Sequence, residues 1–241
     1  MALDEALMES VREGAPPVLR FYRWSPPCLS LGRNQPAAGL YDIDRIASLG
    51  LDVVRRPTGG RAVLHHRELT YSVVIPEGVL GPAKRAYATI NAGLADGLRR
   101  LGVPVALQPA GALRAAVPSL APCFREPAEG EVVAGGRKLI GSAQYSEEGV
   151  TLQHGSLLFA DDQSTVRSLL RVPAPEEDPP AVLESFLDPL PPWETLTAAL
   201  AAGLSAATGF ALLPTDPDPR ERERAATLGT RYGDVAWTWR R

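Results

Sequence analysis

Residues 55–65 constrain the fold most, because they place adjacent arginines and adjacent glycines between two apolar stretches. The run is Arg55, Arg56, Pro57, Thr58, Gly59, Gly60, Arg61, Ala62, Val63, Leu64 and His65. The flanking residues 51–54 and 69–75 are mostly apolar and rich in valine, which predicts a strand on each side. Glycine permits a positive φ and the close approach of a ligand, and successive backbone N–H groups in such a turn hold anions or polar head groups. An ordinary hairpin with arginines at its rim fits the same pattern, so the run alone leaves both interpretations open.

The composition is that of a globular protein without a strong overall charge. The chain has 241 residues, of which 45% are apolar, and its net charge is −3. This length suits one large domain or a domain with a small appendage, and the charge gives no reason to expect nucleic acid or a membrane surface as a partner. No apolar run approaches the length of a membrane span. Two cysteines, Cys28 and Cys123, make no disulfide framework, and they predict a cytoplasmic protein.

Lysine is almost absent from the chain. Of the 25 basic residues, only Lys84 and Lys138 are lysines. Arginine cannot replace a compact ammonium group whose charge is tunable, so a remaining lysine is a candidate for a chemical role. Chance survival is the alternative, and it explains Lys84 well because that residue lies in a predicted exposed helix.

Predicted helices and strands alternate along the chain. Helical spacing covers residues 1–12, 42–49, 83–101, 161–170, 193–207 and 218–228. Strands are predicted at 18–24, 28–32, 51–54, 63–65, 69–75, 103–107, 131–134, 138–140, 150–159 and 210–213, with the small residues 141–144 as an interruption. This alternation predicts an α/β (α+β) protein with a mixed sheet flanked by helices. Because 173–180 is rich in proline and acid, we expect a catalytic domain over 1–172 and a helical C-terminal extension over 173–241, packed on the same domain.

Cys123 is the candidate nucleophile. It follows a loop of small residues, and the strand that comes next leads to Lys138. The thiolate is the reactive form of cysteine, and a nearby cation lowers the thiol pKa. Lys138 would supply that cation or polarise a carbonyl group. An inert buried cysteine is the alternative, and we expect that role for Cys28. No cysteine or histidine spacing predicts a metal site, and neither a dinucleotide-binding motif nor a phosphate-binding loop occurs.

Several motifs resemble those of the lipoate–protein ligase and octanoyltransferase family. They are the arginine–glycine run at 55–65, the lysine motif at 136–144, the His-Gly motif at 153–156, the opening helix at 1–7 and the strand at 20–24. The resemblance extends from Met1 to about Phe159, with a weaker similarity around Tyr232 and Trp237. It implies the catalytic-domain fold of the biotin and lipoate ligases, with mixed β-sheets and flanking helices, related to class II aminoacyl-tRNA synthetases.

The resemblance implies transfer of an acyl group to a lysine of a small carrier domain. The chain is most similar to the cysteine-dependent octanoyltransferases, with which it shares 58–61, 68–72 and the pair Cys123–Phe124. In that branch the cysteine forms an acyl-thioester, and the lysine that matches Lys138 is held to lower its pKa. We therefore expect octanoyl-acyl carrier protein as donor, a lipoyl domain or the glycine cleavage H protein as acceptor, and no cofactor.

The same resemblance implies a set of site residues. The catalytic pair is Cys123 and Lys138, and no metal is expected. The substrate-binding residues are Arg56, Thr58, Gly59, Gly60, Arg61, Ala62, Val63, Leu64, His65, Gly141, Ser142, Ala143 and His154. Within this set, Val63 and Leu64 are expected to line a tunnel for the acyl chain together with Leu139. The chain departs from its relatives at His66, where they often carry aspartate. The given sequence starts at the opening helix, whereas relatives usually carry an extra strand before it.

Two other functions fit the sequence. An ATP-dependent lipoate–protein ligase would form lipoyl-adenylate with Mg²⁺ and would not need Cys123, although such ligases usually carry a third glycine in place of Arg61. A non-catalytic module that binds acyl groups or carrier domains would bind without turnover.

Overall fold

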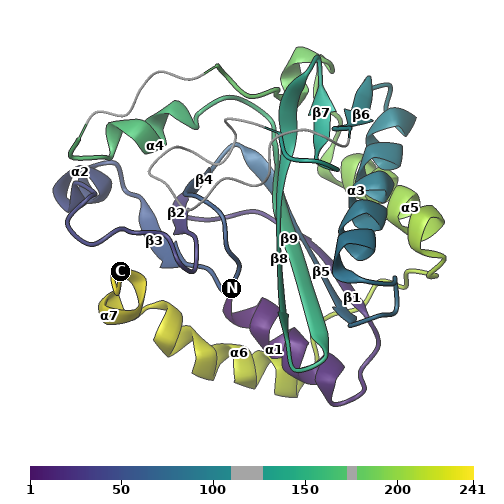
Figure 1. The fold of residues 1–241 in the computed structure, drawn as a ribbon, viewed down its shortest axis with the longest axis horizontal. Helices are drawn as coiled ribbons and strands as arrows, with labels where there is room; N and C mark the ends of the chain where they lie inside the picture. Colours follow the sequence, from purple (N-terminus) through teal and green to yellow (C-terminus); the bar gives the residue numbers. More distant parts are fainter. Residues whose placement is uncertain (110–126, 173–177) are drawn as a thin grey trace.

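The computed structural model describes residues 1–109, 127–172 and 178–241. Its larger sheet contains six antiparallel strands in the order β1, β5, β9, β8, β7, β6. These strands are β1 Val18–Tyr22, β5 Glu68–Pro76, β9 Val150–Leu158, β8 Arg137–Glu147, β7 Val132–Ala134 and β6 Val105–Leu107. The long β8–β9 hairpin runs through the middle of the molecule and separates a helical side from a side with a second, smaller sheet (Figure 1).

The smaller sheet is mixed and has β2 at its centre. Strand β2, Cys28–Leu31, pairs in parallel with β3, Asp52–Arg55, and antiparallel with β4, Val63–His65. The hairpin interpretation of 55–65 is therefore wrong, since β3 and β4 do not pair with each other. All four residues of β2 are buried, and a buried strand needs hydrogen-bonding partners along both edges. The arginine–glycine run crosses over β2 to supply the second edge.

Two helices cover one face of the larger sheet (Figure 1). Helix α3, Ala83–Arg100, buries Ile90, Leu94 and Leu98 in the main apolar core. Helix α5, Trp193–Thr208, packs against α3 through glycines, because a Cβ atom on Gly203 would lie 2.3 Å from the carbonyl oxygen of Gly93. This contact fixes the two helices at close distance.

The remaining helices are α1 Ala2–Arg12, α2 Ile43–Ser48, α4 Ser164–Ser168, the 3₁₀ helix Leu183–Ser185, α6 Pro219–Tyr232 and α7 Val235–Thr238. The 3₁₀ helix contributes Leu183 to the main apolar core. Helix α6 lies along α1 (Figure 1), and Arg224 binds Glu13 across the two with a 2.6 Å ion pair. The indole Nε1 of Trp237 in α7 donates to the carbonyl of Arg55, so the C-terminal residues contact the start of the arginine–glycine run.

Most predicted elements are confirmed, and two are wrong. Residues 141–144 do not interrupt the strand, because β8 continues to Glu147. The two strands approach closely at this point, since a Cβ atom on Gly155 would lie 2.2 Å from the carbonyl oxygen of Gly141. Residues 210–213 form no strand, and Leu213 is 83% exposed. The division at residue 172 stays a prediction.

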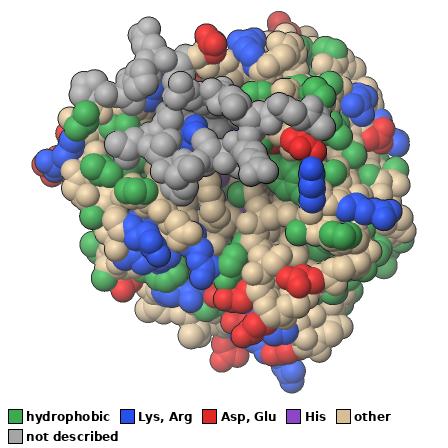
Figure 2. Space-filling view, viewed as in Figure 1, with side chains coloured by type: hydrophobic (Ala, Val, Ile, Leu, Met, Phe, Trp, Pro, Cys, Tyr) green, Lys and Arg blue, Asp and Glu red, His purple; other side chains and the backbone are tan. Residues whose placement is uncertain are grey.

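Acidic and basic side chains are interspersed on the face seen in Figure 2, which agrees with the small net charge. Within the described ranges, no helix combines the length and the apolar character needed to cross a membrane.

Candidate active site

Lys138 is the second residue of β8, within the lysine motif, and it is buried. Only 4% of its side chain is exposed, and its Nζ lies 2.7 Å from Oε1 of Glu131. Lys84 also binds a glutamate, Glu129, but its side chain is 81% exposed. The structure therefore separates the two lysines as expected. Glu131 was missed at the sequence level, although the predicted hairpin at Gly135 and Gly136 brings its strand beside Lys138.

Of the two cysteines, only Cys28 lies among the described residues. Cys123 lies outside the described residues, so its expected role is neither supported nor opposed by the geometry. Cys28 is buried in β2, and burial raises the pKa of its thiol to about 12, with the charge of Asp52 adding to the effect. Cys28 is therefore an inert thiol at neutral pH, as predicted.

Arg56 is buried and holds the glycine turn in shape. Its guanidinium group donates five hydrogen bonds: two to the carbonyl of Gly59, one to the carbonyl of Arg61, and one each to the carbonyl and hydroxyl oxygens of Ser30. A guanidinium has five N–H groups, so these bonds account for all of them. Arg56 thus fixes the turn against β2 instead of lying at a hairpin rim.

Arg55 is also buried, with no exposed surface, and it binds backbone carbonyl groups next to the start of the turn. It donates to the carbonyl oxygens of Thr238, Gly32 and Gln35 at 2.8, 2.6 and 2.8 Å. Burial lowers the pKa of Arg55 to about 10, and the nearby Arg240 adds to this effect. At neutral pH the group is still a cation, and it ties the C-terminal residues to the site.

The glycine turn is held on one side and open on another. A Cβ atom on Gly32 would lie 2.0 Å from the carbonyl oxygen of Gly60, whose φ is +92°, so the two backbones touch. Thr58 Oγ1 lies 2.6 Å from Nε2 of His154 in β9, which links the turn to the larger sheet. By contrast, a Cβ atom on Gly59 would meet nothing within 4 Å among the described residues. Within the described ranges, no atom blocks the backbone at Gly59 from this side.

His154 is a neutral, buried histidine. Burial lowers its pKa to about 3, although the charge of Asp4 opposes this shift. Its Nε2 contacts Thr58, whereas Nδ1 has no hydrogen-bond partner within the part of the chain that the structure describes. The imidazole therefore offers one unused polar atom beside the glycine turn.

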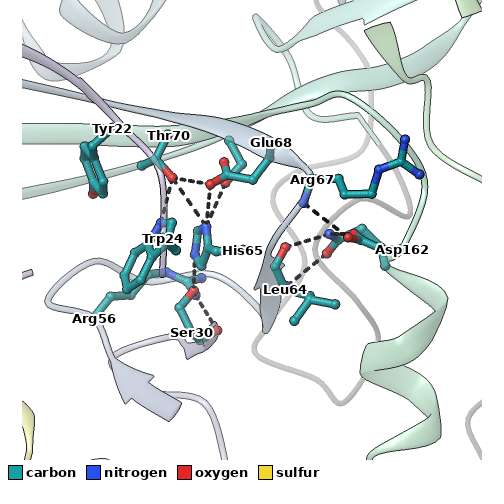
Figure 3. Close-up of polar contacts among 12 residues, drawn as sticks. Tyr22, Trp24, Ser30, Arg56, Leu64, His65, Arg67, Glu68, Thr70 and Asp162 are labelled. Carbon is teal, nitrogen blue, oxygen red and sulfur yellow. Dashed lines mark hydrogen bonds and ion pairs between the residues drawn. The ribbon is translucent and has the colours of Figure 1, made fainter. Parts of the chain in front are cut away.

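His65, at the end of β4, is enclosed by polar side chains (Figure 3). Its Nε2 lies 2.8 Å from Oγ of Ser30, and its Nδ1 lies 3.2 Å from Oγ of Ser156 and 3.4 Å from Oε1 of Glu68. Arg56 also donates to Ser30 Oγ, so this hydroxyl links the guanidinium group to the imidazole.

Glu68 and Trp24 complete this cluster. Thr70 donates to Oε1 of Glu68 at 2.6 Å and accepts from the indole Nε1 of Trp24 at 2.9 Å. The Trp24 ring stacks on His65 with centroids 4.5 Å apart. Both nitrogens of His65 are thus occupied within the protein, so His65 supports the wall of the site and does not present a nitrogen atom to a substrate in this structure. Trp24 and Glu68 had not been predicted as part of it.

The residues after Lys138 on β8 include three further members of the expected site, Gly141, Ser142 and Ala143. Ser142 accepts a 2.7 Å hydrogen bond from Tyr71, and donates to Asn91 at 3.1 Å. Gly141 and Ala143 lie on the same strand, paired in register with Ser156 and His154. The His-Gly and lysine motifs are therefore brought together, as the sequence predicts.

Some predicted site residues are not brought together. Val63, Leu64 and Leu139 are all buried, but they belong to three separate apolar clusters. Ala62 is buried in the cluster of Leu64, whereas Arg61 is half-buried. His66 lies apart at the surface, where its Nδ1 is 3.2 Å from Asp162. No group of three potential metal ligands was found when the described residues were searched.

Comparisons with known proteins agree over nearly the whole chain. Residues 1–204 match the family model of the lipoyl protein ligase A/B catalytic domain. Octanoyltransferase LipM of Kyrpidia tusciae is 40% identical over 257 residues, covering 100% of this chain and 94% of that protein. The same-named protein of Symbiobacterium thermophilum is 41% identical, with 100% and 93% coverage.

Solved structures of lipoate ligases also match nearly the full chain, at lower sequence identity. A lipoate-protein ligase A bound with ATP matches with a TM-score of 0.82 and 26% identity, covering 99% of this chain and 92% of the other. The protein Ta0514 of T. acidophilum with bound lipoic acid matches with a TM-score of 0.80 and 25% identity, with the same coverage.

Proposed function

The chain belongs to the lipoyl protein ligase A/B catalytic domain family, and we propose that within it the protein is an octanoyltransferase that works through a cysteine thioester. The family and the α/β fold expected from the motifs are confirmed by the match over residues 1–204 and by the solved structures. The octanoyltransferase assignment is supported by relatives of about 40% identity that align with the full chain.

The proposed donor is octanoyl-acyl carrier protein, and the proposed acceptor is a lysine of a lipoyl domain or of the glycine cleavage H protein. In the first step, the Cys123 thiolate attacks the donor thioester carbonyl, and the carrier thiolate leaves and takes up a proton. In the second step, the neutral amine of the acceptor lysine attacks the enzyme thioester. An amide forms, the amine loses a proton, and the cysteine sulfur leaves.

This sequence of steps needs no ATP. Exchange of one thioester for another is close to neutral in free energy, and formation of an amide from a thioester is favourable.

The low cysteine content agrees with a cytoplasmic location, which we also propose.

The buried Lys138 is the observation that carries the proposal. An ammonium group in a site with little water interacts strongly with a thiolate and with the oxyanion that forms during attack. Its 4% exposure, against 81% for Lys84, is what a chemical role predicts in a chain with so few lysines. Gly141, Ser142 and Ala143 follow on the same strand, and we propose that they line the acyl site opposite the glycine turn.

The glycine turn is proposed as the other wall of that site. Arg56 and Thr58 hold the turn, Gly60 packs on Gly32, and the open side of Gly59 faces the acyl substrate. The unused Nδ1 of His154 is a polar atom available near the carbonyl end.

Intact-protein mass spectrometry tests this function. The protein is mixed with octanoyl-acyl carrier protein without ATP, beside the variants C123A and C28A. We expect one octanoyl adduct on the wild type and on C28A, none on C123A, and discharge of the adduct by a carrier domain. C28A is the matched control because Cys28 is the other cysteine of the chain.

A lipoate–protein ligase is the second candidate, because a ligase bound with ATP shares the fold at 26% identity. It would show no adduct, and would lipoylate a carrier domain only when ATP, Mg²⁺ and free lipoate are added. Absence of any reaction in both assays would support the binding module instead.

A further inference from the structure

The ion pair between Lys138 and Glu131 joins the proposed catalytic lysine to a residue outside every motif that suggested the site. Nζ of Lys138 and Oε1 of Glu131 are 2.7 Å apart, and their side chains are 4% and 5% exposed. A salt bridge this deeply buried differs from an exposed one, because loss of one partner leaves the other charge buried without compensation.

Glu131 is itself held by its surroundings. Its Oε2 accepts a 2.8 Å hydrogen bond from the backbone N–H of Ala128, and the hydroxyl of Tyr87 lies 3.5 Å from Oε1. Its backbone carbonyl accepts from Gln108 at 2.8 Å. The carboxylate is therefore fixed at the start of β7, where Val133 pairs in register with Lys138.

The other lysine supplies an internal comparison. Lys84 binds Glu129 at 2.8 Å, which is almost the same distance, but the two side chains are 81% and 40% exposed. Water screens such a pair, and exposed pairs contribute little. Two lysine–glutamate pairs, with glutamates only two positions apart, thus differ mainly in burial.

We propose that Glu131 is a positioning residue for acyl transfer, whose carboxylate holds the ammonium group of Lys138 in place and in its charged form. This inference rests on the proposed function, since it takes Lys138 to act on the reacting thioester. Burial disfavours a charged lysine, and an opposite charge at hydrogen-bond distance counters that effect. The pair keeps a cation where the reaction needs one.

Other titratable groups face the pair. Tyr87 approaches the carboxylate from α3, and Tyr71 on β5 senses the same charge. Burial raises the pKa of Tyr71 well above its usual value, and the charge of Glu131 raises it further, so this phenol is neutral at all pH values of interest. Arg137, the neighbour of Lys138, is exposed.

The scarcity of lysine allows a direct test that does not depend on activity. Protein labelled with ¹³C at lysine Cε gives two side-chain signals, and K84R identifies the signal of Lys138 by elimination. In E131Q we expect the titration midpoint of Lys138 to fall by about one pH unit or more, the usual effect of an opposite charge at this distance. E129Q is the matched control, and it should leave the Lys138 signal unchanged.

Octanoyl transfer is measured on the same variants. E131Q should lower kcat roughly tenfold to hundredfold, as misplacement of a reacting group does, with the KM for the donor unchanged. The limb of its pH profile that follows the lysine should move to lower pH, which a merely structural role would not cause. E131D, which keeps the charge, should recover part of the rate, and E129Q should behave as the wild type.

The outcomes separate the inference from the proposed function. An unchanged Lys138 titration in E131Q, or a changed titration with full transfer, overturns the role of Glu131. If the wild type transfers no octanoyl group, the proposed function fails, whereas the titration still decides whether Glu131 holds the charge. If E131Q does not fold, a scalar coupling across the hydrogen bond from Lys138 Nζ to a glutamate carboxyl carbon is sought in the wild type, and its absence refutes the pair.

Discussion

Replacing Gly32 by alanine should damage both the stability and the activity of the protein, because the new Cβ atom would overlap the glycine turn. It would lie 2.0 Å from the carbonyl oxygen of Gly60 and 2.9 Å from its carbonyl carbon. Even the shortest contacts that Cβ atoms make in proteins are about 1 Å longer than this, and the atoms in the way are backbone, which cannot rotate aside. The turn must therefore move by about 1 Å.

The expected magnitude follows from two opposing effects. Overpacking of this kind costs about 1–3 kcal/mol, and the contact with backbone places G32A near the upper end. Alanine also leaves the unfolded chain with fewer conformations than glycine does, and this stabilises the folded state by about 0.4–1 kcal/mol. The net loss is about 2 kcal/mol, which for a chain of this size lowers Tm by roughly 4–8 °C. A 1 Å shift of the turn should also slow octanoyl transfer by up to about 100-fold.

Gly59 supplies the matched comparison for thermal unfolding followed by circular dichroism. Its Cβ position meets no atom within 4 Å in the described part of the chain, so G59A should melt close to the wild type. Transfer by G59A should nevertheless fall, because the new methyl group would occupy the side where we place the acyl substrate. If G32A melts like G59A, the contact between Gly32 and Gly60 does not exist in solution and the reasoning is refuted.

Three further predictions concern His154, Arg56 and the two lysines. The pKa of His154 is about 3 in the folded protein, against 6.5 for an unperturbed histidine, so the unfolded chain binds an extra proton as pH falls below about 6.5. The unfolding free energy should consequently drop by about 1.4 kcal/mol per pH unit in that range. Urea denaturation of the wild type and of H154Q at pH 7 and pH 5 should show that the pH dependence is smaller in H154Q. Equal pH dependence in both proteins would contradict the buried neutral histidine. R56K should cost about 3 kcal/mol in urea denaturation, because an ammonium group cannot reach all the oxygens that the guanidinium binds, and a loss below about 0.5 kcal/mol would argue against the clamp. K84R should have an unfolding free energy within about 0.5 kcal/mol of the wild type and the same rate of octanoyl transfer. K138R should transfer octanoyl groups at least about tenfold more slowly. Retained activity in K138R would exclude the proposed role of Lys138.

Local patterns predicted the helices and most strands well. In α3, apolar residues at helical spacing, among them Ile90, Leu94 and Leu98, lie in the core as expected. The paired glycines at 135 and 136 predicted the β7–β8 hairpin, and both have positive φ. These features depend on residues close together in sequence, so periodicity and turn chemistry are sufficient to find them.

Features set by distant contacts were harder to predict. Residues 141–144 have low strand propensity, yet they continue β8 because they pair in register with residues 153–156 of β9. The pairing of β2 with both β3 and β4 depends on a crossover that no local pattern reveals. Arginine is usually a surface residue. Arg55 and Arg56 are buried because they donate hydrogen bonds to backbone carbonyl groups that come together only in the folded chain.

The site itself shows why motif reading found some functional candidates and missed others. Lys138 was identified by its rarity, but rarity alone does not distinguish it from Lys84, and burial does. Glu131 carries no such compositional signal, since the chain holds 28 acidic residues. It becomes visible only when a strand pairing places its carboxylate against a buried ammonium group. In this chain the sequence therefore points to the lysine that we propose takes part in the chemistry, and the strand pairing points to the carboxylate that we propose keeps this lysine charged. The titration of Lys138 consequently bears on both proposals.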